Sequence, residues 1–435
     1  MAAQGPLTPS AAYGMISISE AQAIVLEHCR VLPVERVPTH EAVGMVCAEA
    51  VVAKDPLPPF PASIKDGYAV VASDGPGEYP LVGEALAGTS GSLKVEPGTV
   101  AYITTGAPLP PGADAVVMIE QTEALAPGDD GRKRVKVNKG VVAGADVRPV
   151  GVDIGCGTVI LHPGDRIGIA EVGLAGSVGA AAVSAYRRPC VAVLSNGDEI
   201  VSSDTASLGP GQIRDSNRPM LLAAARETGA LVTDMGIVGD KQGSLEETFE
   251  KAIQDGADVI ITSGGVSMGA RDLIKPLLEK KGTIYFGKVC MKPGKPLTFA
   301  TIEDSGSGRT ILVFALPGNP VSSYACFHLV VASALRKCQG WREPSLRRVH
   351  VRLSSAAKMD SGRPEFQRAR IHWESDGEGA GQFVAKGTGS QLSSRLLSAL
   401  SANALLEIPQ GTGEVPSGAT VSAVLVDDLR HMSLQ

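Results

Sequence analysis

Two lysines held in a proline-rich turn are the residues of this chain best placed to do chemistry. Lys292 and Lys295 are separated by Pro293-Gly294 and followed by Pro296, so the backbone between the two ammonium groups has little freedom. A charged loop is usually just solvated, which is the plain alternative. Each opposite charge at about 4 Å contributes roughly 4 kcal/mol at an effective dielectric near 20, before the cost of desolvation. The pair therefore predicts an anion site.

Two further loops, residues 262–269 (TSGGVSMG) and 316–322 (LPGNPVS), favour anions for a different reason. Each follows an apolar run that predicts a strand and precedes a segment that predicts a helix. Glycine lets the backbone approach a ligand closely, and the free N–H groups and partial positive charge of a helix start attract anions. Taken alone, Ser322 is also explained as an ordinary helix cap. The three loops together predict a polyanionic small molecule as ligand.

Other polar residues follow predicted strands of the same region. The loop 195–199 (SNGDE) is explained by turn chemistry when taken alone, and Asn217 by capping of a helix that extends to residue 228. Asp240 follows another strand. Asp272 lies in a first helical turn, where it either compensates the helix dipole or holds magnesium with a substrate phosphate. Arg363 and the pair Ser393-Ser394 fit exposed β-turns equally well.

Composition excludes several classes of protein. The 435 residues favour two to four domains, and a net charge of −6 argues against a nucleic-acid surface as the main partner. The sequence has no apolar run of 18 residues, so no membrane span is expected. Seven scattered cysteines predict reduced core residues of a cytoplasmic protein. The first fourteen residues predict a disordered tail.

The elements that must position these residues change in character along the chain. A helix over 20–30, capped by Ser19, and a second over 39–46 precede a β module over 67–138. From residue 189, apolar runs at 190–194, 231–238, 259–262, 283–286 and 311–315 alternate with helical segments, among them 244–255 with Ser244 as cap and a closing helix over 322–337. This alternation predicts a parallel sheet with helices on both faces and a ligand at the carboxyl ends of its strands. A β module of about ninety residues follows.

Absent motifs narrow the chemistry. The sequence contains no paired cysteines, P-loop, nucleophile elbow or dinucleotide fingerprint. A transition metal handled here would arrive as an oxyanion held by cationic, hydroxyl and backbone N–H groups, or leave bound to an organic ligand.

The motifs in their order resemble the molybdenum insertase family, the molybdopterin molybdenumtransferases, over about residues 15–426. The pieces that carry the resemblance are 58–70 (PPFPASIKDGYAV), 104–117 (TTGAPLPPGADAVV), 211–218 (GQIRDSNR), 262–269, 291–299 (MKPGKPLTF), 316–322 and 401–406 (SANALL). The nearest pattern is the plant-type insertase domain, which is similar to the E domain of gephyrin.

The resemblance implies an α/β multidomain fold. A disordered tail (1–14) would be followed by an elongated dimerisation domain (15–45 plus 147–184), an inserted β domain (46–146), a three-layer αβα molybdopterin-binding domain (185–338) and a C-terminal β-barrel (339–435). It also implies a homodimer, with the active cleft shared between subunits, and a separate molybdopterin adenylyltransferase that delivers the substrate.

The family reaction inserts molybdenum from molybdate into adenylylated molybdopterin with release of AMP and with Mg²⁺ as cofactor. The resemblance implies that molybdate is held by Arg363, Ser393, Ser322, Lys292 and Lys295. It implies that the pterin nucleotide lies over Ser195, Asn196, Gly197, Asp198, Glu199, Asn217, Ser263, Gly264, Gly265 and Ser267. Asp240 and Asp272 would assist magnesium and phosphoanhydride cleavage, and Asp66 and Thr105 would come from the partner subunit.

Two rivals remain at this stage. Gephyrin uses the same domain as a scaffold that binds receptor tails, and this alternative predicts tolerance to substitution at Lys292, Lys295 and Arg363. An adenylyltransferase of the related pterin-binding fold is the second, but it would leave every residue outside the α/β region of about 150 residues unexplained.

Overall fold

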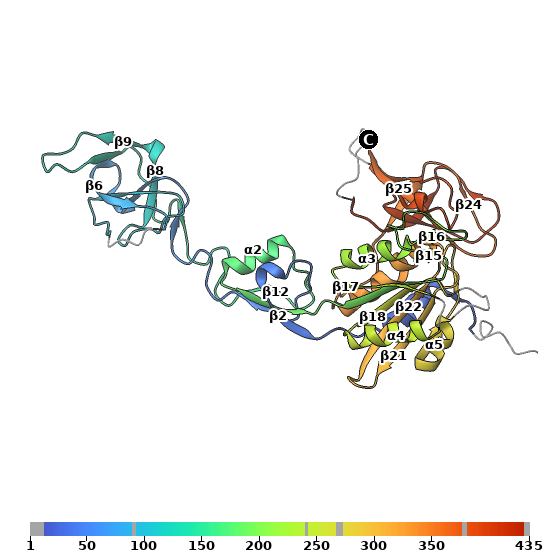
Figure 1. Cartoon of the computed structure of the whole chain (residues 1–435). Coiled ribbons are helices and arrows are strands. Elements are labelled where there is room, and N and C mark those ends of the chain that lie inside the picture. The colour runs from blue at the N-terminus through green and yellow to red at the C-terminus, as the bar shows by residue number, and fades with distance from the viewer. Residues whose placement is uncertain (1–12, 89–92, 240–241, 267–272, 376–380, 430–435) are drawn as a thin grey trace, which may run out of the picture. The chain divides into compact units, whose positions relative to one another are not determined.

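The computed structural model of this chain describes residues 13–88, 93–239, 242–266, 273–375 and 381–429. These residues form two compact units. One unit combines Met1–Glu35 with Tyr186–Gln435, and the other comprises Arg36–Ala185 (Figure 1). The larger unit contains the α/β sheet and a β-barrel, so it carries most of the predicted site.

A six-stranded mixed sheet forms the centre of the larger unit. Its order is β17 (Leu231–Val238), β14 (Cys190–Asn196), β18 (Val259–Ser263), β22 (Arg309–Leu316), β21 (Thr298–Asp304) and β19 (Gly282–Phe286). The first four strands are parallel, as predicted, but β21 pairs antiparallel with both β22 and β19. The prediction of a parallel sheet is wrong at this edge. Residues 305–308 join β21 to β22 as a hairpin, which is too short for a parallel crossover.

Helices cover both faces of this sheet, as predicted. The side chains of β14 alternate between two apolar cores, with Val191 and Val193 in one and Ala192 and Leu194 in the other. The first core includes residues of α1 (Ile18–His28), α3 (Asn217–Glu227), α6 (Pro320–Cys326) and α7 (Ala332–Cys338), and the second includes residues of α4 (Gln242–Gln254) and α5 (Ile274–Lys281). Residues Phe327–Val331 form a π-helical turn between α6 and α7, where a single helix was expected.

Several predicted helix starts are wrong. Ser17, not Ser19, caps α1, because its hydroxyl accepts from the Glu20 N–H while the Glu20 carboxylate accepts from the Ser17 N–H. Ser244 is the third residue of α4 and does not cap it. Asn217 is the first residue of α3 rather than its cap. The helix expected over 39–46 is a single 3₁₀ turn, Thr39–Glu41, and Gly44 with φ +84° ends any continuation.

The C-terminal part of the larger unit is a closed β-barrel. Its strands, in order, are β23 (Arg348–Leu353), β26 (Gly381–Gly387), β25 (Glu365–Ser375), β27 (Ala404–Ile408) and β29 (Thr420–Leu425). Buried side chains such as Ile371, Leu406 and Val421 fill it. The predicted fold class, an α/β multidomain protein with a C-terminal β-barrel, is confirmed.

The smaller unit is mostly β-structure. A six-stranded sheet has the order β8 (Ala115–Met118), β5 (Gly67–Val70), β7 (Val100–Ile103), β6 (Gly77–Ala85), β10 (Arg134–Val137) and β9 (Thr122–Leu125). This sheet confirms the β module predicted over 67–138. A separate apolar core gathers residues of β3 (Val51–Val52), β12 (Val159–Leu161) and α2 (Ile169–Ser177). The domain boundaries that the resemblance implies inside this unit stay predictions.

No helix within the described ranges is both long and apolar enough to cross a membrane. All seven cysteines are free. Cys29, Cys47, Cys326 and Cys338 are buried, as the sequence predicts, whereas Cys156 is exposed.

Candidate functional site: two adjoining cavities

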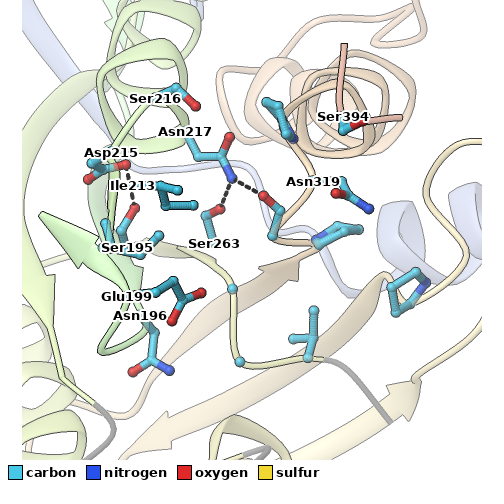
Figure 2. A pocket seen from close by; sticks show the side chains of 18 of the residues that line it. Ser195, Asn196, Glu199, Ile213, Asp215, Ser216, Asn217, Ser263, Asn319 and Ser394 are labelled. Atoms are coloured by element: carbon cyan, nitrogen blue, oxygen red, sulfur yellow. Dashed lines mark hydrogen bonds between the residues drawn. The ribbon is translucent and has the colours of Figure 1, made fainter. Parts of the chain in front are cut away.

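The first cavity, of about 820 Å³, lies at the carboxyl ends of β14, β18 and β22. Its wall includes the predicted nucleotide-binding residues Ser195, Asn196, Glu199, Asn217, Ser263, Gly264 and Gly265. Figure 2 shows Asn217 pointing toward Ser263, and Ser195 toward Asp215, in this part of the wall. The rule that ligands bind at this edge of an α/β sheet therefore predicts the position of the cavity correctly.

A buried polar network shapes the wall of this cavity. The Asn217 amide donates to Ser263 Oγ at 2.6 Å and to the Gly318 carbonyl at 2.8 Å (Figure 2). The Ser195 hydroxyl donates to Asp215 Oδ1 at 3.0 Å, and Asp215 also accepts from Arg218 Nε at 2.9 Å. Asn217 thus joins α3 to the ends of β18 and β22. The side chain of Asn217 therefore bonds to neighbouring strand ends and does not cap α3.

Glycine at position 264 is required by geometry. Its φ is +90°, and an added Cβ would lie 2.2 Å from the Asn196 carbonyl oxygen. Gly265, with φ +66°, would place a Cβ 2.7 Å from the Asn196 amide nitrogen. Any other residue would push the ends of β14 and β18 apart. The glycines therefore let the cavity floor close tightly at this point.

A second cavity, of about 790 Å³, contains all five residues predicted to bind molybdate. Its wall includes Lys292, Lys295, Ser322, Arg363 and Ser393, together with Lys358, Asp360 and Glu365. These lining residues include four cationic and two acidic side chains, which leave a formal charge of +2. A tetrahedral dianion would neutralise that charge.

Lys292 is fixed by two carboxylates and by its backbone. Its Nζ lies 3.2 Å from Asp360 Oδ2 and 3.4 Å from Glu365 Oε1, and Glu365 is only 4% exposed. The Lys292 N–H donates to the Pro364 carbonyl at 2.9 Å, and the Lys292 carbonyl accepts from Phe366 N–H at 2.7 Å. The lysine loop is therefore attached directly to the start of barrel strand β25.

Arg363 is held by the same loop. Its Nη1 donates to the Met291 carbonyl at 2.9 Å, and its backbone N–H donates to Asp360 Oδ1 at 3.0 Å. A hydrogen bond from the Gly362 N–H, with Lys292 adding to it, holds the pKa of the Asp360 carboxyl below its ordinary value. The ionised Asp360 therefore holds the Lys292 ammonium group and the Arg363 backbone.

The loop that carries Ser393 accepts a hydrogen bond from a buried arginine. Arg368 is fully buried; its Nε donates to Ser398 Oγ at 3.1 Å, and its Nη2 donates to the Leu392 carbonyl at 3.4 Å. Burial lowers the pKa of this guanidinium to about 10. The Ser393 carbonyl accepts from Val321 N–H at 3.1 Å, which joins the loop to α6.

The two cavities adjoin each other. Lys295, Pro296 and Asn319 belong to the walls of both. A single lysine, Lys295, therefore borders both cavities.

Some predicted site residues lie elsewhere. Asp66 and Thr105 belong to the smaller unit, where the Thr105 N–H donates to Asp66 Oδ1 at 2.7 Å. The Gly197 N–H donates to the Val238 carbonyl. Asp198 lies beside Gly239, where a Cβ added to the glycine would be 2.9 Å from Asp198 Oδ1. Neither Gly197 nor Asp198 is among the residues that line the cavities. Asp240, Ser267 and Asp272 lie outside the described residues.

Sequence reasoning missed several residues of the two walls: Lys275, Lys288, Lys358, Asp360 and Glu365. Of these, Asp360 stands three residues before Arg363 and Glu365 two residues after it, and this nearness to the predicted turn is the signal that could have indicated them. Nothing in the sequence distinguishes Lys275 from other helical lysines.

A mixed sheet with two adjoining cavities at its carboxyl edge, joined to a closed barrel, defines a multidomain α/β protein with sites for small polar ligands. Three family profiles match the chain. They are the MoeA N-terminal region (domain I and II) at residues 16–179, the probable molybdopterin binding domain at 192–337, and the MoeA C-terminal region (domain IV) at 350–426. The chain belongs to the MoeA family of molybdopterin molybdenumtransferases.

Similar proteins cover nearly the whole chain. Gephyrin of Dictyostelium discoideum is 39% identical over 96% of this chain, which spans 63% of the length of that protein. Molybdopterin molybdenumtransferase 2 of Mycobacterium tuberculosis is 35% identical over 93% of this chain and 98% of its own. The crystal structure of a molybdopterin biosynthesis MoeA protein from Pyrococcus horikosii superimposes with a TM-score of 0.76 at 30% identity, over 95% of this chain and 99% of that one.

Proposed function

We propose that this chain acts in molybdenum cofactor biosynthesis and inserts molybdenum from molybdate into adenylylated molybdopterin, releasing AMP. The observation that carries the proposal is the pair of adjoining cavities that share Lys295, the second with a formal charge of +2. A transferase that joins an oxyanion to an organic ligand needs two such sites side by side. The names of the full-length relatives support the same pathway.

The chemistry of insertion suits the second cavity. Molybdate that binds the two sulfur atoms of a dithiol loses one oxo group, and the two thiol protons leave with it as water. Lys292, Lys295 and Arg363 would stabilise the dianion and orient it toward the wall that both cavities share. Ser322 and Ser393 would supply neutral hydrogen bonds.

Magnesium would assist the release of AMP. Asp240 and Asp272 supply carboxylates, which together with phosphate oxygens are the ligands that Mg²⁺ prefers. Val266 and Lys275, on either side of the segment that contains Asp272, both line the first cavity. Within the described ranges, no group of three His, Cys, Asp or Glu side chains forms an alternative metal site.

The remaining parts of the proposal concern assembly. We place Asp66 and Thr105 in the cleft of the partner subunit of a homodimer, and we expect a separate adenylyltransferase to deliver the pterin. The buried free thiols Cys29, Cys47, Cys326 and Cys338 favour a reducing compartment such as the cytoplasm.

The direct test is incubation of the purified protein with adenylylated molybdopterin, Mg²⁺ and molybdate. We expect release of AMP and formation of a cofactor that reactivates a molybdoenzyme lacking it. A matched reaction without molybdate separates insertion from simple hydrolysis. Absence of both AMP release and reactivation would refute the proposal and favour the scaffold alternative.

A further inference from the structure

The charged residues of the first cavity are divided between its two ends. Glu199, Arg214 and Asp215 come from the segment after β14, whereas Lys275, Lys288 and Lys295 come from α5 and the loops on either side of β20 (Val289–Cys290). In the sheet, β14 and β19 are four strand positions apart. Neighbouring strands lie about 4.8 Å apart, so the two groups lie at opposite ends of the cavity. One end therefore carries two carboxylates and one guanidinium, and the other carries three lysines with no acidic residue among those that line it.

The three lysines are held close together. Lys275 is 4% exposed, and its Cε would lie 3.5 Å from a Cβ built on Gly287, the residue that precedes Lys288. The Lys295 carbonyl accepts from the Val289 N–H at 2.9 Å, which brings the loop that carries Lys295 back beside residue 288. Gly287 itself lines the cavity. Two adjacent backbone segments and one helix thus bring three ammonium groups to one end of the cavity.

Three like charges near one another make the potential at this end of the cavity positive. Lys275 is among the few charged side chains of the described residues that are almost completely buried. A ligand with two or more negative charges would complement the three lysines that line this end. Phosphate groups fit, because each phosphate oxygen accepts hydrogen bonds from ammonium donors.

The opposite end suits hydrogen-bond donors of a ligand. Asn217 is 7% exposed, and among the described residues its Oδ1 has no hydrogen-bond partner, since only its amide nitrogen is engaged. A buried amide oxygen left in this state is costly unless a ligand donates to it. The Glu199 side chain lines the same end (Figure 2). A ring that carries N–H groups, as pterins and purines do, supplies such donors.

We propose that Lys275 and Lys288, together with Lys295, form a phosphate subsite of the first cavity, and that the nitrogen heterocycle lies at the Asn217 end. The identity of the ligand rests on the proposed function, but the subsite itself does not. Free diphosphate and the phosphate of a nucleotide share the chemistry that these lysines recognise.

The test uses the whole chain and three probes: inorganic pyrophosphate, AMP and adenosine. Lys275→Met and Lys288→Met each remove one ammonium group while keeping an unbranched side chain. Lys280→Met is the matched control, because Lys280 lies on the same helix α5, is exposed and pairs with Glu246 at 3.1 Å. Binding is measured by titration calorimetry in the presence of Mg²⁺ at two salt concentrations.

We expect the affinity for pyrophosphate and AMP to fall about tenfold in each of the two cavity variants and to depend less on salt than in the unmodified chain. Adenosine binding and the control variant should be unaffected. Unchanged pyrophosphate affinity in both cavity variants would overturn the inference, and so would the absence of pyrophosphate binding by the unmodified chain. The two proposals can fail separately. If the variants lose pyrophosphate binding but the unmodified chain releases no AMP from adenylylated molybdopterin, the subsite is supported and the proposed function is refuted.

Discussion

At the scale of single residues, the second cavity contains ion pairs as well as cations. Lys292 contacts Asp360 and Glu365, and Asp360 also accepts from the backbone of Arg363. These contacts partly neutralise the cations and hold them in position before an anion arrives. Preorganised charges lose little entropy when the ligand binds, so substitution of one cation should weaken anion binding without affecting the neighbouring cavity.

Arg363→Ala should raise the molybdate concentration needed for half-maximal activity by about tenfold or more, because a guanidinium bonded to an oxyanion contributes roughly 1.5 to 3 kcal/mol. AMP binding, measured by calorimetry, should stay unchanged, since Arg363 is not among the residues that line the first cavity. Arg352→Ala is a suitable control: Arg352 is on the same barrel and pairs with Glu374. Equal losses of molybdate use and AMP affinity would contradict the assignment of Arg363.

At the scale of elements, the segment that carries the two lysines depends on one glycine. Gly294 has φ +119°, and an added Cβ would lie 2.7 Å from Cys326 Sγ and 2.8 Å from Met291 Cε. Cys326 is in α6 and fully buried, so it has little room to move. The loop therefore lies against α6 only because residue 294 lacks a side chain.

Gly294→Ala should lower the free energy of unfolding by about 1 to 3 kcal/mol and also raise the molybdate requirement, because the loop must shift to relieve the contact. Gly387→Ala, on β26, is the control, since nothing lies within 4 Å of its added Cβ. Both quantities can be measured on the same preparations by urea denaturation and by the insertion assay. If Gly294→Ala keeps the wild-type free energy of unfolding and the wild-type molybdate requirement, the loop does not need the close approach of residue 294 to Cys326.

The π-helical turn between α6 and α7 contains a buried titratable group. Burial, with Arg336 adding to it, lowers the pKa of His328 from 6.5 to about 4. Between these values the unfolded chain binds more protons than the folded one, so stability is lost as pH falls from about 6.5 toward 4. From pH 7 to pH 5 the loss should be about 2 kcal/mol, and His328→Gln should remove most of it.

Tryptophan fluorescence in urea at the two pH values measures this difference. Trp341 and Trp373 are the two tryptophans of the chain, and both belong to the larger unit that contains His328. The signal therefore reports the unfolding of that unit. An equal pH dependence in the variant and the unmodified chain would show that other groups cause the acid sensitivity.

The sequence predicts some elements better than others, for physical reasons. The buried parallel strand β18 is an almost continuous apolar run, so its position is predicted within a residue. The antiparallel strand β21 was missed, because it directly follows the lysine loop and has no helix before it. The site residues carried by loops were predicted through the family motif, whereas Lys275 depends on tertiary contacts that no local pattern encodes.

At the scale of the whole molecule, the proposed homodimer would bring Asp66 and Thr105 of one subunit to the cleft of the other. Asp66 and Thr105 belong to the smaller unit, and both cavities belong to the larger one. The smaller unit also exposes apolar side chains, Ile169 at 85%, Val52 at 43% and Val159 at 39%. Val52 and Val159 are cross-strand partners, and neighbouring exposed apolar side chains are a common feature of subunit interfaces. A symmetric homodimer would cover them and let one subunit complete the cleft of its partner.

Mixing of two impaired variants tests this arrangement, at a molybdate concentration too low for the Arg363→Ala chain alone to be active. In a dimer of Asp66→Asn with Arg363→Ala chains, the larger unit of the first variant keeps Arg363, and the second variant supplies it with an intact Asp66. Random pairing makes about half of the dimers mixed, each with one intact site, so about a quarter of the wild-type activity should return after co-refolding. The control pairs Lys292→Ala with Arg363→Ala; because both residues belong to the same unit, this mixture should stay inactive. If the Asp66 mixture also stays inactive although mixed dimers form, the cleft is completed within one chain, and the proposed sharing between subunits is wrong.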